Sequence, residues 1–198
     1  MPTPSRRAAL ALFAAALAAP HVARAVTPAE AERFIRDMID DLIAILKRAD
    51  AQNARVNEFL DLFRRTTALA DIGRFTMGLN WRQMTDAQKR AFLDAFERYA
   101  ARVYVNRIGD YNGQSIEITE AQDVGRKGVL VKSLLKQPDA EDIRVEWLVN
   151  DRNGPPQLVD IIAEGVSLSI SQREEFASMV EQRNGDIDEF IADLETLG

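Results

Sequence analysis

The chain has 198 residues, with 25 lysines and arginines against 31 aspartates and glutamates, no cysteine and one histidine, His21. It therefore forms no disulfide. Beyond His21 it lacks the His and Cys ligands of zinc, copper and haem sites and the usual Ser-His-Asp and Cys-His nucleophiles. This composition favours a protein that works with carboxylates, backbone groups and apolar surface.

The N-terminus has the pattern of a cleavable export signal. Arg6 and Arg7 give a positive start, residues 8–19 form an apolar stretch too short to span a bilayer, and Ala23-Arg24-Ala25 is a small-x-small cleavage pattern. We therefore expect residues 1–25 to be a signal peptide that is cleaved near Ala25. An uncleaved N-terminal anchor is the alternative, and the export route stays open.

The mature domain is expected to comprise residues 26–198 and to lie in the periplasm. Cleavage removes three arginines and no acid, so 22 basic and 31 acidic residues remain and the formal charge is −9. Such an acidic body repels nucleic acid and anionic lipid at long range, which argues against docking on a bare membrane. The length suits one domain with a full hydrophobic core.

Three helices are predicted in the first half of the mature chain. Thr27-Pro28-Ala29-Glu30 is a capping box that begins an amphipathic helix ending at about Lys47. A second helix is expected from about Val56 to Ala70. Thr85-Asp86-Ala87-Gln88 is another capping box and begins a long third helix.

The hydrophobic period then changes from about 3.6 to 2, which indicates strands. Four strands are expected, at residues 115–119, 129–134, 143–149 and 158–163. Short turns join them, so they predict an antiparallel meander with one covered face. Ser171-Gln172-Arg173-Glu174 is expected to cap a further helix, and Asp186 to begin a short terminal one. The fold class is α+β, a single domain with a curved antiparallel sheet of about four strands packed against several helices.

Motifs that could carry chemistry are better explained as structure. Asp151-Arg152-Asn153-Gly154 lacks the carboxylate pattern of a calcium loop and predicts a hairpin turn. Gly125-Arg126-Lys127-Gly128 lacks the ending of a phosphate loop and joins two strands. Arg64, Arg65 and Arg74 could contact an anionic group, but surface ion pairs on helices are commoner. We therefore expect no catalytic residue, no metal site and no enzymatic activity.

Three blocks of sequence carry a family resemblance. They are Asp71-Ile72-Gly73-Arg74-Phe75-Thr76-Met77-Gly78-Leu79-Asn80-Trp81, then Gln88-Lys89-Arg90-Ala91-Phe92 with Phe96, Tyr104 and Tyr111, and finally Val159-Asp160-Ile161-Ile162-Ala163-Glu164-Gly165-Val166-Ser167-Leu168 followed by Arg173 and Phe176. In this order they resemble the MlaC-type family, the periplasmic lipid-binding components of toluene-tolerance and lipid-asymmetry ABC transport systems. Met77 departs from the leucine that is usual in the family.

The resemblance implies an apolar pocket between sheet and helices that holds a phospholipid by its acyl chains. It implies a carrier, with bound lipid as cargo and no cofactor, that shuttles between an outer-membrane lipoprotein complex and an inner-membrane ABC transporter bearing an MCE-domain protein. Such a carrier would maintain outer-membrane lipid organisation. Three alternatives stay open: a carrier or accessory protein for a hopanoid or another lipid, a periplasmic adaptor that binds no lipid, and a carboxylate hydrolase.

By matching position, the resemblance also implies which residues contact the lipid. Those on the sheet are Ile116, Ile118, Val129, Val131, Val145, Trp147, Val149 and Ile161. Those on the helices are Phe75, Phe96 and Tyr104. Each would fit an ordinary hydrophobic core equally well, because spacing alone does not reveal a cavity.

Overall fold

The protein folds into six α-helices and an open five-stranded sheet within the part described by this computed structural model, residues 25–47, 52–108, 113–138 and 140–197. The elements in chain order are α1 (Pro28–Leu46), α2 (Gln52–Thr66), α3 (Leu69–Met77), η1 (Asn80–Arg82), α4 (Asp86–Ile108), β1 (Ser115–Asp123), η2 (Gly125–Lys127), β2 (Val129–Lys136), β3 (Ile143–Asn150), β4 (Gln157–Ala163), β5 (Val166–Ser167), α5 (Leu168–Gln182) and α6 (Ile187–Thr196). Neighbouring strands are antiparallel in the order β1-β2-β3-β4-β5. The expected α+β class is confirmed, and the sheet has one more strand than expected.

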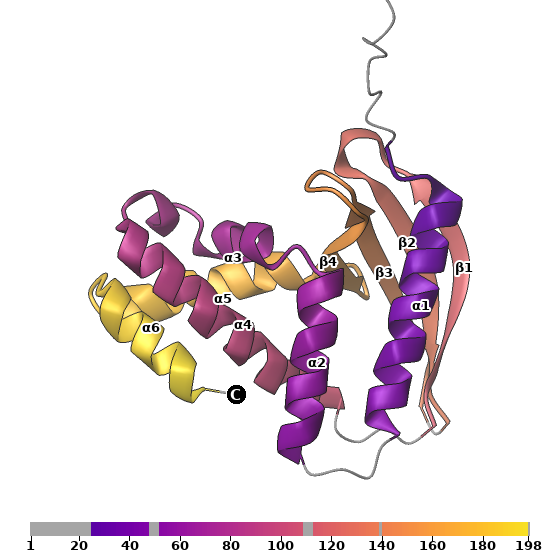
Figure 1. The fold of residues 1–198 in the computed structure, drawn as a ribbon, viewed down its shortest axis with the longest axis horizontal. Coiled ribbons are helices and arrows are strands. Elements are labelled where there is room, and N and C mark those ends of the chain that lie inside the picture. The colour runs from indigo at the N-terminus through magenta and orange to yellow at the C-terminus, as the bar shows by residue number, and fades with distance from the viewer. Residues whose placement is uncertain (1–24, 48–51, 109–112, 139, 198) are drawn as a thin grey trace, which may run out of the picture.

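Figure 1 shows two lobes. In the sheet lobe, α1 lies along one face of the sheet and packs on β1, β2 and β3. In the helical lobe, α3, α4, α5 and α6 pack on one another, and α2 stands between α1 and α4. Each lobe has its own hydrophobic core, centred on Ile35, Val131 and Val149 in the sheet lobe and on Phe92 and Phe176 in the helical lobe.

Both predicted capping boxes are present. At α1 the Glu30 amide donates to Thr27 Oγ1 at 3.3 Å, and Glu30 Oε2 accepts from the Thr27 amide at 3.0 Å. At α4 the Thr85 amide donates to Gln88 Oε1 at 3.0 Å, and the Gln88 amide donates to Thr85 Oγ1 at 3.2 Å. Each box satisfies amide groups at a helix N-terminus, where no carbonyl of the helix can reach them.

Two predicted helix boundaries were wrong. The second helix ends at Thr66 rather than Ala70, because the chain turns to meet β4: the Ala68 amide donates to the Leu158 carbonyl at 2.9 Å before α3 begins. The helix expected to be capped at Ser171 begins at Leu168, because Ser167 is its N-cap and accepts from the Ile170 amide at 3.1 Å. The first boundary is set by a contact with the sheet, and the second by an N-cap serine four residues earlier than expected.

Two glycines permit close packing and a tight turn. A Cβ on Gly73 of α3 would lie 2.8 Å from Leu93 Cδ2, so glycine lets α3 approach α4 this closely without displacing that side chain. Gly165 and its neighbour Glu164 both have positive φ angles, 82° and 49°, and form the two-residue turn between β4 and β5. This turn adds the fifth strand that the alternation did not reveal and brings the chain to the start of α5.

An apolar cavity between the two lobes

A cavity of about 150 Å³ lies where the sheet lobe meets the helical lobe. Its walls come from α1, α2, α3, α4, the adjoining parts of β3 and β4, and the first turns of α5. The apolar lining residues are Met38, Leu42, Phe59, Leu62, Phe63, Ile72, Phe96, Tyr99, Ala100, Val103, Tyr104, Trp147, Leu158, Val159, Ile161 and Leu168. Because these residues belong to separate hydrophobic clusters, the cavity is the space that the clusters leave between them.

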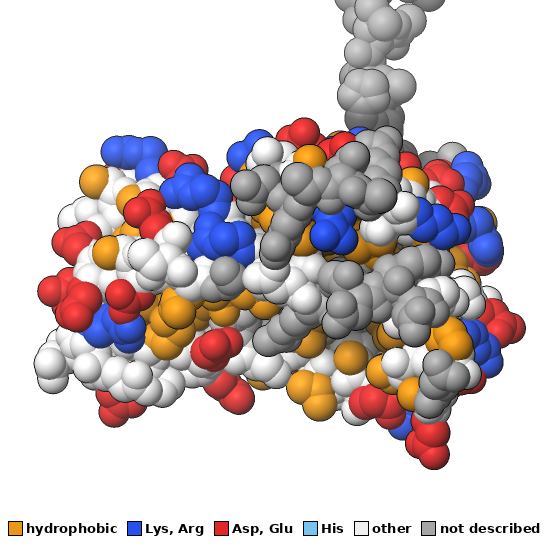
Figure 2. Space-filling view, turned by 90° about the horizontal axis from the view of Figure 1, so that it is seen from below, with side chains coloured by type: hydrophobic (Ala, Val, Ile, Leu, Met, Phe, Trp, Pro, Cys, Tyr) orange, Lys and Arg blue, Asp and Glu red, His pale blue; other side chains and the backbone are white. Residues whose placement is uncertain are grey.

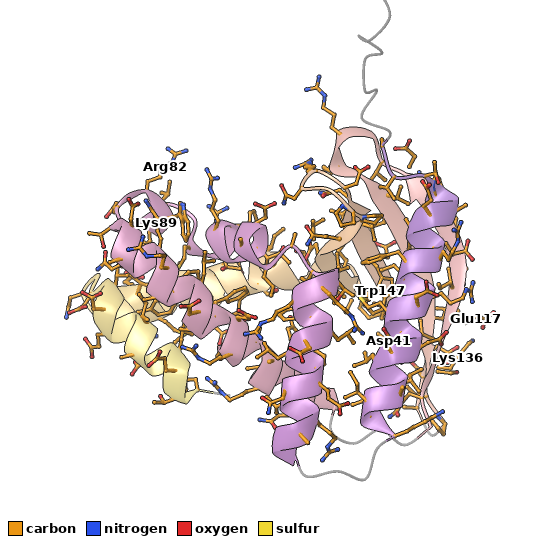
Figure 3. All side chains as sticks on the ribbon, in the orientation of Figure 1. Asp41, Arg82, Lys89, Glu117, Lys136 and Trp147 are labelled. Atoms are coloured by element: carbon orange, nitrogen blue, oxygen red, sulfur yellow. The ribbon has the colours of Figure 1, made fainter. Side chains whose placement is uncertain are left out.

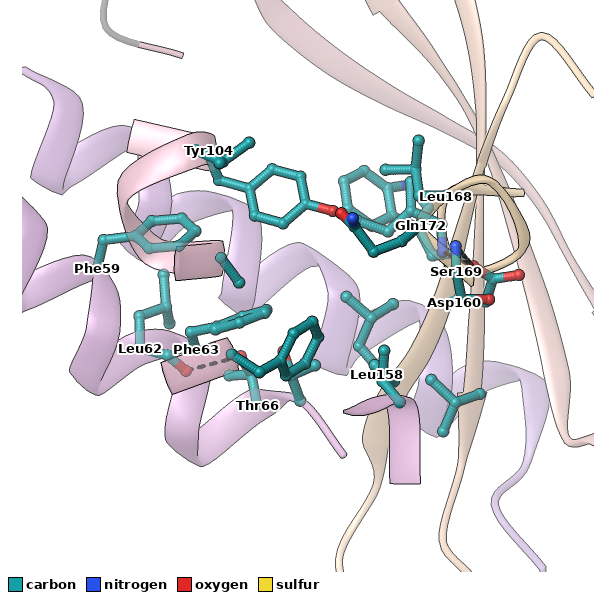
Figure 4. Close-up of a pocket in the computed structure, with 18 of the residues that line it drawn as sticks. Phe59, Leu62, Phe63, Thr66, Tyr104, Leu158, Asp160, Leu168, Ser169 and Gln172 are labelled. Carbon is teal, nitrogen blue, oxygen red and sulfur yellow. Dashed lines mark hydrogen bonds between the residues drawn. The ribbon is translucent and has the colours of Figure 1, made fainter. Parts of the chain in front are cut away.

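Aromatic rings form one wall of the cavity, as Figure 4 shows. Phe59 and Phe63 are one turn apart on α2 and stack with ring centroids 5.7 Å apart. Tyr104 of α4 meets Phe63 edge-on at 6.2 Å. Such ring pairs stabilise one another beyond simple burial, so α2 and α4 present a firm apolar surface.

Trp147 of β3 forms part of the opposite wall, and Figure 3 shows it between the sheet and the helices. Its Nε1 donates to Ser133 Oγ at 2.9 Å, and that hydroxyl donates to the Val145 carbonyl at 2.9 Å. Both side chains are buried. Because the indole N–H is satisfied within the sheet, the ring is fixed and only its apolar body is left for the cavity.

Most polar lining groups are occupied by the protein itself. Thr66 Oγ1 donates to the Leu62 carbonyl at 2.7 Å, the dashed line in Figure 4, and Thr76 Oγ1 donates to the Gly73 carbonyl at 2.9 Å. Asp160 Oδ1 accepts from the Ser169 amide at 3.1 Å, and its Oδ2 accepts from Ser167 Oγ at 2.6 Å. The Asp160 carboxylate thus sits at the N-terminus of α5, where the helix dipole favours an anion. It ties α5 to β4.

The structure brings four of the predicted site residues to the cavity: Phe96, Tyr104, Trp147 and Ile161. The others do not line it. Val129, Val131, Val145 and Val149 lie in the core beneath α1, with Ile116 and Ile118 packed against that core, and Phe75 is 40 % exposed on the outer side of α3. Lipid contact by all of these residues stays a prediction.

The resemblance placed no site residue on α2, although that helix supplies Phe59, Leu62 and Phe63 to the cavity. Their helical spacing does indicate a buried face, but periodicity does not separate a face that meets core from one that meets a cavity. Leu168, Ser169 and Gln172 were missed because α5 was expected to begin later. In Figure 4, Gln172 and Tyr104 point toward each other.

The described residues contain neither a cluster of metal-binding side chains nor a membrane-spanning helix. No group of three or more His, Asp or Glu side chains there is placed to hold a metal ion. Within the same part of the chain, no helix combines the length and the apolar character needed to cross a membrane. Seen from below, in Figure 2, hydrophobic side chains reach the surface in separate patches among charged groups.

Comparison with known proteins gives two findings. The family described as MlaC protein matches residues 36–196. The fold is similar to that of a phospholipid-binding protein from Ralstonia solanacearum, solved in complex with a phospholipid, with a TM-score of 0.69 and 20 % sequence identity over 83 % of this chain and 98 % of that chain. At this identity the second finding shows a shared fold.

Proposed function

Since the chain belongs to the MlaC protein family, we propose that it binds a phospholipid by its acyl chains and carries it between membranes. The observation that carries this proposal is the apolar cavity between the two lobes. It offers acyl chains a surface of aromatic and aliphatic side chains, with most polar groups turned back to the protein. The phospholipid held by the Ralstonia solanacearum protein of the same fold supports the proposal.

The chemistry of such a carrier needs no catalytic group. Removing a CH₂ group from water stabilises it by about 0.8 kcal/mol, so exposing two long acyl chains would cost roughly 20 kcal/mol or more. A dry apolar site is therefore sufficient for tight binding. Because a bilayer is equally apolar, lipid transfer between cavity and membrane is nearly balanced, and partners or ATP set its direction. We propose a binding and transport protein rather than an enzyme, with cargo and no cofactor.

The cavity must widen to hold this cargo. A cavity of about 150 Å³ accommodates a ligand the size of benzene, far less than two acyl chains. The two lobes have separate cores. They can therefore move apart along the cavity without opening either core, and we propose this as the route by which the chains enter.

The partners and location are proposed from the family. We propose that the protein works in the periplasm and exchanges lipid with an outer-membrane lipoprotein complex and with an inner-membrane ABC transporter that bears an MCE-domain protein. The predicted signal peptide lies outside the described residues except for Ala25. A hopanoid or another lipid as cargo, or an adaptor without lipid, are the alternatives.

Organic extraction followed by mass spectrometry of the purified mature protein tests the proposal. We expect about one phospholipid per protein molecule. Recovery of a hopanoid would change the cargo and keep the carrier. A protein that carries no lipid, and takes up none from phospholipid vesicles in the presence of its partner complexes, would contradict the proposal and favour the adaptor.

A further inference from the structure

Among the basic side chains of the described residues that form no ion pair, six exposed ones lie on neighbouring segments. We call this set the basic edge; its members are Arg74, Arg82, Arg126, Lys127, Arg152 and Arg173. They come from α3, η1, η2, the β3–β4 turn and α5, and all are exposed. Segments far apart in the sequence thus contribute to one surface.

Direct contacts join these segments. Arg152 of the β3–β4 turn donates through Nη2 to the Arg126 carbonyl of η2. The next residue of that turn, Asn153, donates through Nδ2 to Asp71 Oδ2 of α3 at 2.7 Å. Figure 1 shows α3 beside the end of β4, and Figure 3 places Arg82 at the far end of the helical lobe. The basic edge therefore spans both lobes.

The basic edge gathers six unpaired cations on adjoining segments. Elsewhere several exposed cations are paired, as in Arg65 with Asp41 at 2.7 Å and Arg98 with Glu195 at 3.0 Å, whereas Arg33 of α1 and Arg90 of α4 are exposed and unpaired among the described residues. The charge of the whole chain is −6, yet a partner at contact distance meets mainly the local charges, because salt screens charges beyond about 8 Å. None of the six cations of this edge is held in an ion pair within the described residues, so each can pair with a carboxylate of a partner.

Two apolar side chains lie among these cations. Phe75 is 40 % exposed and Leu79 is 72 % exposed. The Arg173 guanidinium lies over the Phe75 ring, 5.3 Å from its centroid. An exposed aromatic ring in contact with an arginine is typical of protein interfaces, in which aromatic residues and arginine are enriched.

The basic edge also adjoins the cavity. Ile72 and Thr76 line the cavity from α3, the helix that carries Arg74 and Phe75 on its exposed side. Gln172 lines it from α5, next to Arg173. A partner bound at the basic edge would therefore lie one helix away from the cargo.

We propose that the basic edge docks on a folded protein partner whose surface presents carboxylates around an apolar depression that receives Phe75 and Leu79. Guanidinium groups form planar two-point pairs with carboxylates and phosphates alike, so the exposed Phe75 ring beside Arg173 is what favours a protein partner. Two exposed apolar side chains on a chain of net negative charge give little hold on an anionic bilayer. The proposal rests on the proposed function only for the choice of partner complexes in the test.

The test compares two double variants by equilibrium binding to the MCE-domain complex and to the outer-membrane lipoprotein complex, each in nanodiscs, at low and moderate salt. Arg74→Glu with Arg173→Glu reverses two charges of the basic edge. Arg65→Glu with Arg98→Glu makes the same charge change at exposed positions on α2 and α4. Lipid carried by each purified protein is measured in parallel, and it reports on folding and on the proposed function separately from docking.

We expect the basic-edge variant to bind at least one complex about tenfold or more weakly than the wild type, because attraction becomes repulsion at two contacts. The control pair should bind within about twofold of the wild type, and both variants should keep their lipid. Unchanged binding of the basic-edge variant to both complexes would overturn the proposal. A second result would also overturn it. If the wild type binds tightly to bare vesicles of one part phosphatidylglycerol and three parts phosphatidylcholine, and the basic-edge variant does not, the basic edge docks on a lipid surface.

Discussion

Two regions of the same sheet face have different surroundings. Trp147 and Val149 are alternate residues of β3, so their side chains lie on one face, and both are buried. Val149 lies in the closed core beneath α1, whereas Trp147 also lines the cavity beside the helical lobe. The strand pattern decides which face a residue occupies, and the element packed over that face decides whether it meets core or cavity.

The largest expected effect is loss of the folded state when a charge is placed in the closed core beneath α1. Val149→Asp should abolish the folded state, because an unpaired carboxylate in a fully buried site costs several kcal/mol, a large part of the stability of a typical domain. Circular dichroism during urea unfolding measures this. Leu148→Asp, on the other face of the same strand and half-buried, is the control and should unfold at a much higher urea concentration. A folded Val149→Asp protein that has lost only its lipid would place Val149 in the cavity instead.

A change in the cavity wall should affect cargo rather than folding. Phe63 is half-buried on α2, so Phe63→Glu should leave the domain folded while its carboxylate repels acyl chains. We expect the lipid that co-purifies to fall about tenfold or more, as measured by mass spectrometry. Arg65→Glu places a carboxylate on the exposed side of the same helix and should retain wild-type lipid. Equal lipid in both variants would contradict a lipid site at this wall.

The hydrogen bonds that join β4 of the sheet lobe to α5 of the helical lobe are expected to contribute less to stability. Asp160 holds the N-terminus of α5 against β4 through the Ser169 amide and the Ser167 hydroxyl. Asp160→Ala leaves these donors without their acceptor, which should lower the free energy of unfolding by about 1–3 kcal/mol. Thermal unfolding measures this, with Asp123→Ala, at the exposed end of β1, as the control. Equal melting temperatures for the two variants would mean that the Asp160 hydrogen bonds add no more stability than the exposed Asp123 does.

The smallest effect concerns pH at the edge of the sheet. The Arg144 amide, followed by its guanidinium, holds the pKa of the Glu164 carboxyl below its ordinary value. This stabilisation is complete above the unfolded-state pKa of about 4.3 and is lost as pH falls through the lower folded-state pKa. Wild type should therefore lose slightly more stability than Glu164→Gln between pH 6 and pH 3. Chemical denaturation at each pH measures the free energy of unfolding. Equal losses for the wild type and Glu164→Gln would show that the ion pair adds no stability.

Local signals predicted much of the fold. The capping boxes at Thr27 and Thr85 and the alternation in β3 depend on groups a few residues apart, and each lies where expected. The beginning of α5 was missed because it depends on Asp160, which reaches Ser169 only after the Glu164-Gly165 turn has formed. Contacts between elements are not visible in local spacing.

The sequence by itself determined the residue types, the net charge, the α+β class and the resemblance to a family. Tertiary structure alone decided which apolar residues meet a cavity, because a cavity is space left between packed elements. It also decided that Arg74, Arg152 and Arg173 share one edge without acidic partners while Arg65 and Arg98 are paired. Net charge is a sum over the chain, whereas a partner meets only the charges that the fold places side by side.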